Sequence, residues 1–244
     1  MKYFLQFKRE FYSYFFSPIA YAVIGASALL NGVMFFLIIL LLSRSEMTTG
    51  TPMEMLFSWI LFWVVELVLT PVITMRAFAE ERHLGTFESL VTAPVNISII
   101  VFAKYSSALL LYIIMWLPTL VYPIIISTYS TLDIGPVISG YIGTFAIGGM
   151  LISIGIFASA LTKNQIVAAL LSFALIMMLF LMGLFRYADW IPAADFFEQL
   201  DLIGHMEDFA KGIIDTRHLI YYATITIFAL FGTVQVLESR RWMR

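Results

Sequence analysis

The sequence predicts an all-α polytopic membrane protein with six transmembrane helices. Hydrophobic residues make up 61% of the 244-residue chain and charged residues only 12%, and the mean hydropathy is +0.93, well above what the core of a soluble domain requires. Six apolar stretches are long enough to cross a hydrocarbon layer of about 30 Å as helices. Their unbroken apolar character differs from the alternating segments of about ten residues that form an outer-membrane barrel.

The six predicted spans follow one another along most of the chain. Each needs roughly 20 apolar residues in a helix, because lipid offers no hydrogen-bond partner to open backbone groups. The spans are expected at Ile19 to Leu42, Leu56 to Met75, Tyr105 to Ser127, Val137 to Leu161, Gln165 to Gly183 and Leu219 to Leu237. No repeat or change of composition marks a second unit, so residues 1–244 are expected to form a single membrane domain.

The distribution of basic residues predicts the orientation. Six crossings put both termini on one side, where ten lysine and arginine residues fall, and leave four on the other side, namely Arg44, Arg186, Lys211 and Arg217. Because loops rich in lysine and arginine stay in the cytoplasm, both termini are expected to be cytoplasmic. Most acidic residues then face outward, so the formal net charge of −2 conceals an asymmetry.

Residues 1–17 are expected to form an amphipathic helix that lies in the membrane interface. Four phenylalanines recur at helical spacing with polar residues between them: Phe4, Phe7, Phe11 and Phe15. Pro18 then lets the chain turn into the first span. A plain cytoplasmic anchor is one interpretation of this helix, and it is compatible with every function considered below.

Residues 184–218, before the last span, mix aromatic and acidic side chains. This segment is too apolar for a solvated linker and too interrupted to span. It is expected to form short extracytoplasmic helices, re-entrant or interfacial, with Pro192 helping to start one near Ala193. A cap over an exit route and simple interfacial packing both remain open.

Segment 76–95 follows the second span directly and concentrates charge in an otherwise apolar chain. Ala77 to Leu84 favour a helix, Gly85 is a natural break, and a second helical stretch ends before Pro94. Its apolar side chains are expected to anchor in a partner's groove: Phe78, Leu84, Phe87 and Leu90. Its charged side chains are expected to specify register through ion pairs: Glu80, Glu81, Arg82 and Glu88. An ordinary solvated loop is the alternative.

The same segment resembles a motif of the ABC-2 type transporter permeases. In that motif a run of acidic and basic residues is followed by Gly-Thr, an aromatic residue or Leu, Glu, Leu and finally Ala-Pro-Val. The stretches Ser17 to Tyr21, Ser153 to Val167 and Gly212 to Arg217 are similar to one branch, the gliding-motility-associated permease subunits. The resemblance covers nearly the whole chain. It implies that segment 76–95 is a coupling helix seated on an ATPase, with these contact residues: Arg76, Phe78, Glu80, Glu81, Arg82, Leu84, Gly85, Thr86, Phe87, Glu88 and Leu90.

The resemblance also implies partners and location. It predicts a permease subunit in the inner membrane of a bacterium, coupled to two copies of an ABC ATPase subunit that use ATP and Mg. The second permease is expected to be an identical copy or a related chain with an extracytoplasmic domain. Membrane lipid is an expected partner and nucleic acid is not. The alternative is an ATP-driven component of an envelope or gliding machinery that transmits force or regulates it without a soluble substrate.

The residues needed for catalysis are missing from the sequence. It contains no Gly-x-x-x-x-Gly-Lys-Ser/Thr loop to hold phosphates, so the chain is not expected to hydrolyse ATP or to bind a cofactor directly. Its three histidines are far apart, which does not match the spacing of a metal site. The predicted spans contain neither histidine nor aspartate for an intramembrane protease. We therefore expect a non-catalytic membrane subunit.

Two further features lie inside the predicted spans. Glu66 is in the middle of the second span, where a charge costs about 2.5–3.5 kcal/mol and needs compensation. A proton site, a substrate contact and a polar contact across a dimer are functional interpretations, whereas a protonated carboxyl bonded to a neighbouring helix is a structural one. The fourth span is rich in small residues, which predicts either tight helix packing or a sliding surface.

Overall fold

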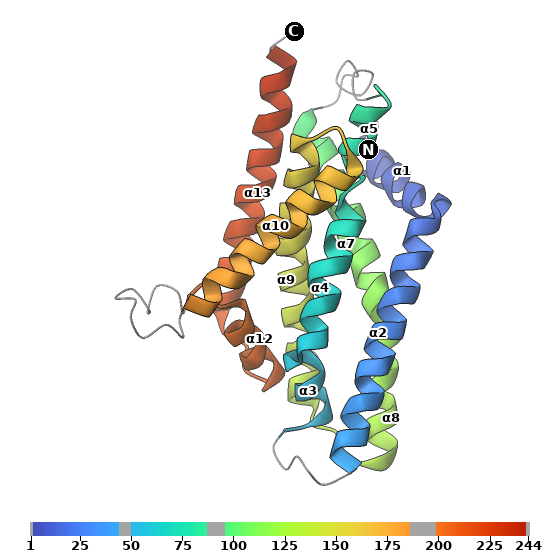
Figure 1. The fold of residues 1–244 in the computed structure, drawn as a ribbon, viewed down its shortest axis with the longest axis vertical. Coiled ribbons are helices and arrows are strands. Elements are labelled where there is room, and N and C mark those ends of the chain that lie inside the picture. The colour runs from blue at the N-terminus through green and yellow to red at the C-terminus, as the bar shows by residue number, and fades with distance from the viewer. Residues whose placement is uncertain (1, 44–49, 87–95, 186–198, 243–244) are drawn as a thin grey trace.

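A computed structural model describes residues 2–43, 50–86, 96–185 and 199–242. The chain within these ranges is built from helices without a strand, and six of the helices are long and apolar enough to cross a membrane. The predicted all-α polytopic class is confirmed. Figure 1 shows an elongated bundle in which both ends of the chain lie at the same end as α5 (Ala79–His83). We call this the terminal end and the opposite end the distal end.

The amphipathic segment forms α1 (Lys2–Phe16), which Ser17 alone separates from the first span, α2 (Pro18–Ser43). A proline suits the first turn of a helix because its missing N–H would have no intrahelical partner there. Four aromatic rings contact one another in turn along α1, with centroids of successive rings 5.0–6.3 Å apart: Tyr3, Phe7, Phe11 and Phe15. In Figure 1, α1 runs across the terminal end at a steep angle to α2.

The predicted second span is interrupted near its start. α3 (Pro52–Ser58) begins with a capping box, in which the Thr51 hydroxyl accepts from the Glu54 backbone N–H while the Glu54 carboxylate accepts from that of Thr51. Trp59 then adopts an extended backbone with φ −77° and ψ 154°, so the helix cannot continue through it. The span itself is α4 (Ile60–Thr74). The span thus begins four residues after the predicted start at Leu56, which belongs to the separate helix α3.

The third span is longer than predicted. It starts with α7 (Ile97–Trp116), passes through a 3-10 turn, η1 (Leu117–Leu120), that contains Pro118, and ends with α8 (Val121–Tyr129). Proline cannot donate the backbone hydrogen bond of an α-helix, which explains the change of helix type. The predicted start at Tyr105 was too late because Lys104 is neutralised by carboxylates inside the chain, so the helix extends past it.

The fourth span, α9 (Ile134–Leu161), is the central helix and packs against α4, α7, α10, α12 and α13. A Cβ atom added at any of four α9 glycines would lie 2.1–2.7 Å from a neighbouring side chain, so the neighbours rest directly on the α9 backbone. The pairs are Gly140 with Phe57, Gly143 with Phe209, Gly148 with Tyr112 and Gly155 with Thr74. The glycines therefore support the tight-packing interpretation of this span.

The remaining helices close the bundle. α10 (Gln165–Leu184) is the fifth span, and the Asn164 side chain caps it by accepting from the Ile166 N–H at 2.9 Å. α12 (Leu202–Ala210) is a short helix that packs on α3 and α9, with Asp201 as its N-cap. The helix expected near Ala193 lies outside the described residues. The last span is α13 (Thr216–Trp242).

Candidate functional site

The charged segment forms α5, which leaves α4 through a tight turn at residues 75–78. Ser159 of α9 holds this turn. Its hydroxyl oxygen accepts from the backbone N–H groups of Phe78 at 3.0 Å and Ala79 at 3.1 Å, and donates to the Met75 carbonyl at 3.0 Å. A hydroxyl can donate once and accept twice, so this side chain is fully used. The start of α5 is thus fixed to α9.

Arg82 attaches the other end of α5 to the same helix. Its guanidinium donates to the carbonyl oxygens of Ala160 at 2.6 Å and Thr162 at 3.0 Å. Ala160 lies in the last turn of α9 and Thr162 is its C-cap residue, so these carbonyls lie at the helix end, where backbone oxygens lack intrahelical partners and carry partial negative charge. A cation there both satisfies the carbonyls and complements the helix dipole.

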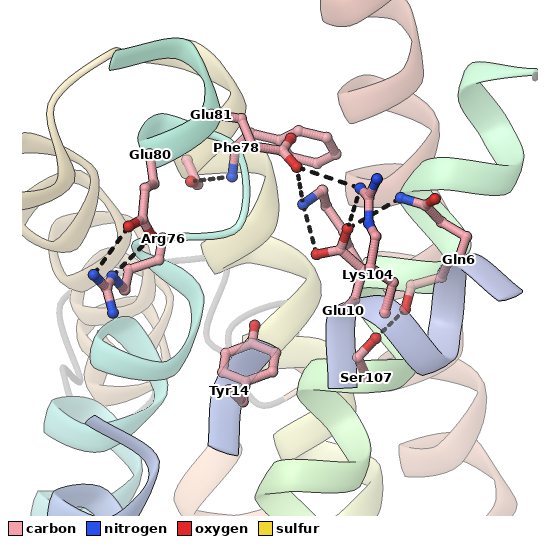
Figure 2. Close-up of polar contacts among 12 residues, drawn as sticks. Gln6, Glu10, Tyr14, Arg76, Phe78, Glu80, Glu81, Lys104 and Ser107 are labelled. Carbon is pink, nitrogen blue, oxygen red and sulfur yellow. Dashed lines mark hydrogen bonds and ion pairs between the residues drawn. The ribbon is translucent and has the colours of Figure 1, made fainter. Parts of the chain in front are cut away.

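Lys104 of α7 joins α5 to α1 on the opposite side (Figure 2). Its side chain is only 4% exposed, and its ammonium donates to Glu10 Oε2 at 2.8 Å and Glu81 Oε1 at 2.9 Å. The ammonium also lies 5.2 Å from the centre of the Phe78 ring, within the range of a cation–π interaction. Buried ammonium groups need such partners. Sequence reasoning missed Lys104, although a single lysine inside an apolar helical run was a usable signal.

Helix α1 contributes Glu10, one of the two carboxylates that pair with Lys104. Burial alone would raise the pKa of its carboxyl, but Lys104 and Arg9 outweigh burial and hold the pKa below its ordinary value of 4.5. Arg9 contacts Glu10 at 2.8 Å and is largely exposed. Glu10 is therefore ionised at neutral pH and paired with both bases.

A second ion pair lies where α4 meets α5. Arg76 contacts Glu80 Oε2 at 2.9 Å and donates to the Ser17 hydroxyl at 2.7 Å, at the junction between α1 and α2. The Tyr14 hydroxyl of α1 donates to the Ile73 carbonyl of α4 at 3.3 Å. The Arg76–Glu80 pair and the ion-pair group of Lys104 both line one cavity of about 510 Å³ between α1 and α5. Side-chain bonds across this cavity, rather than solid apolar packing, connect these two helices.

Among the predicted contact residues, some are exposed, Phe78 is buried, and some lie outside the described ranges. Leu84 is 65% exposed at the tip of the segment, and Gly85 follows it with φ +72°, a conformation that favours glycine. Phe78 is fully buried, so the expectation that it offers an exposed anchor was wrong: its ring packs inside the chain beside Lys104. The Thr86 hydroxyl donates to the Glu81 carbonyl at 3.2 Å. Three predicted residues lie outside the described ranges: Phe87, Glu88 and Leu90.

Comparison with known families decides which family this architecture represents. A family model described as ABC-2 family transporter protein matches residues 66–232, which is more than half of the chain and includes α5. The chain belongs to the ABC-2 transporter family. A search of curated proteins finds no match. The ABC-2 match supports a multi-pass membrane protein of the permease type and does not extend to the gliding-motility branch.

Family membership also bears on chemistry and partners. ABC-2 permeases are typically non-catalytic membrane subunits, and the family implies an ABC ATPase as partner. Within the described ranges no cluster of three or more histidine, aspartate or glutamate side chains is arranged to hold a metal ion.

Glu66 of this ABC-2 chain lies away from α5, in the interior between α4, α7 and α9. Its carboxyl is fully buried, accepts a hydrogen bond from the Tyr112 hydroxyl of α7, and lies 3.5 Å from the Thr70 hydroxyl. The Tyr112 oxygen is also 3.0 Å from the Thr144 carbonyl of α9. One phenol proton cannot serve both acceptors, so a neutral carboxyl that donates to Tyr112 would satisfy the set. The polar partners of Glu66 thus come from its own chain.

Proposed function

We propose that this chain is the permease subunit that converts ATP hydrolysis by a separate ABC ATPase into transport across the bacterial inner membrane. The observation that carries the proposal is the attachment of α5. This short charged helix presents an exposed tip at Leu84, continues from α4 through one turn, and is bonded to α9 by Ser159 and Arg82. A load applied to the tip therefore reaches two membrane spans directly.

The mechanism follows from this attachment. Closure of two ATPase subunits around ATP and Mg displaces α5 of each permease, and α4 and α9 move with it because their bonds to α5 are short and at least partly buried. Six spans form a small pathway, so two permease chains are needed, either identical or one with an extracytoplasmic domain. Alternating opening toward the cytoplasm and the outer leaflet then moves the substrate. In this arrangement the terminal end, with both termini, faces the cytoplasm.

A second candidate rests on the stretches Ser17 to Tyr21 and Gly212 to Arg217, which resemble the gliding-motility branch. In that case the same ATP-driven motion transmits force to an envelope assembly or regulates it, and no soluble substrate is moved. Transport of a solute by purified, reconstituted complex excludes this candidate.

The test is gentle detergent purification of the chain, with mass spectrometry of the proteins that accompany it. An ABC ATPase is expected in the wild-type complex. Leu84→Asp should release the ATPase, because it places a carboxylate at the exposed tip without touching the buried bonds of α5. The matched control is Ile213→Asp, the same change at an exposed residue after α12, which should leave the ATPase bound. Retention of the ATPase by Leu84→Asp would contradict the proposed contact.

A further inference from the structure

Helix α1 is attached to the spans along its whole length, which a simple membrane anchor does not require. Near its start, the Tyr3 hydroxyl lies 2.6 Å from the Ser106 hydroxyl of α7. In its middle, Glu10 pairs with Lys104 of α7. Near its end, Tyr14 donates to the Ile73 carbonyl of α4. A helix that only floats in the interface would satisfy these polar groups with water and lipid headgroups.

The middle attachment is the one that also includes α5. Lys104 is buried and holds Glu10 and Glu81 at nearly equal distances of 2.8 and 2.9 Å, so one ammonium connects α1, α5 and α7 (Figure 2). A second contact between α1 and α5 joins Arg9 to Glu81 at 3.8 Å, and this arginine is 55% exposed. Exposed ion pairs of this kind contribute little. Because a cavity separates the two helices, their connection depends mainly on Lys104.

The end of α1 is equally constrained. Only Ser17 separates it from α2, and the Ser17 hydroxyl accepts from Arg76 at 2.7 Å at the base of α5. A rotation or shift of α1 must therefore move the start of the first span. Conversely, α2 cannot stay in place while α1 follows α5.

From these contacts we propose that Lys104 is a positioning residue that makes α1 and α5 move as one body, so that the first and third spans receive the motion of α5 together with the second. This inference rests on the proposed function, since it concerns how a load on α5 is distributed. α1 is then a transmission element and not only an anchor. Lys104 acts through the positions of Glu10 and Glu81.

The experiment uses the complex of permease and ATPase and spin-label distance measurements. The chain has no native cysteine, so single cysteines can be placed without background. Labels at exposed Lys8 of α1 and His83 of α5 measure the distance between these two helices. A second pair, at Tyr21 and Lys163, measures the movement of the first span relative to the loop between α9 and α10. Distances are recorded without nucleotide and with ATP trapped by vanadate.

In the wild-type complex the distance between positions 8 and 83 should be narrow and equal in both states, while the distance between 21 and 163 shifts. Lys104→Met should broaden the first distribution and abolish the nucleotide-dependent shift of the second, with the ATPase still bound. Lys104→Arg should keep both wild-type results. The matched control is Lys211→Met, an exposed lysine near α12, which should also behave as wild type.

If Lys104→Met fails to fold because two carboxylates are left facing each other, the variant that combines it with Glu10→Gln and Glu81→Gln removes the charges of all three side chains and should give the same loss. The inference is overturned if positions 8 and 83 separate on ATP binding in the wild-type complex, or if these variants retain the shift at position 21. Absence of an ATPase from the wild-type complex is a different result, which refutes the proposed function itself.

Discussion

Replacing Gly148 with alanine tests how the aromatic rings are held on α9. An alanine Cβ would lie 2.2 Å from two atoms of the Tyr112 ring, which is fully buried and cannot rotate into free space. The ring must shift, and the Tyr112 hydroxyl then leaves the Glu66 carboxyl. Overpacking costs about 1–3 kcal/mol and an unpaired buried polar group about 1–3 kcal/mol more, while alanine returns about 1 kcal/mol of helix propensity. A net loss of about 1–5 kcal/mol is expected.

Thermal unfolding in detergent, followed by tryptophan fluorescence, measures this loss. A loss of 1 kcal/mol corresponds to a decrease of about 2–4 °C in Tm for a domain of this size, so a decrease of several degrees is expected. The matched control is Gly25→Ala in α2, where a Cβ would meet nothing within 4 Å. That control should leave Tm unchanged or slightly raise it. Equal Tm values for the two variants would refute the view that the Tyr112 ring packs directly on the backbone of Gly148.

Three further outcomes follow from the described contacts. Ser159→Ala leaves two backbone N–H groups at the start of α5 without an acceptor, so hydrogen exchange at Phe78 and Ala79 should accelerate, whereas Ser127→Ala, on the exposed part of α8, should not affect it. Glu66→Gln supplies an amide N–H that can donate to the Tyr112 hydroxyl as the neutral carboxyl does, and it should fold with normal assembly; loss of transport in this variant would show that the carboxyl takes part in function, and unchanged transport would leave it a structural role. The lowered pKa of Glu10 means that its pairing with Lys104 stabilises the fold above pH 4.5 and is lost as the pH falls through the lowered value, whereas burial raises the pKa of Glu81 above 4.5, so Glu81 loses its charge first as the pH falls; the distance between labels at positions 8 and 83 should therefore begin to broaden above the pH at which Glu10 becomes neutral, and a distribution that stays narrow until Glu10 is protonated would contradict the assignment.

The spans could be predicted because the bilayer leaves the backbone no choice but a helix wherever an apolar run is long enough. Their interruptions could not. Trp59 has an extended backbone although it is neither glycine nor proline, so no helix-breaking residue marks this interruption in the sequence. The late start predicted for the third span shows the same limit, since Lys104 looks like the edge of the membrane until Glu10 and Glu81 are known to surround it.

The position of the candidate site along the chain could be predicted from the sequence, but the tertiary contacts that hold it could not. The density of charge around Glu80 and Glu81 located the segment, and Gly85 located its break. The side chains that fix it come from positions about 80 residues away in the case of Ser159, and no local pattern encodes that pairing. Phe78 was expected to anchor in a partner's groove because it belongs to the apolar stripe of the segment, yet its side chain is fully buried inside the chain.

The four α9 glycines on which neighbouring side chains pack restrict the motions that this helix bundle can make. Turning α9 about its own axis would bring larger side chains under Phe57, Phe209, Tyr112 and Thr74 at once, and each would collide with the neighbour that now rests on bare backbone. Steric clashes therefore prevent rotation of α9 about its own axis. When α5 moves, α9 and the helices that pack on its glycines are therefore expected to shift together as whole units, without rotation of α9 about its own axis.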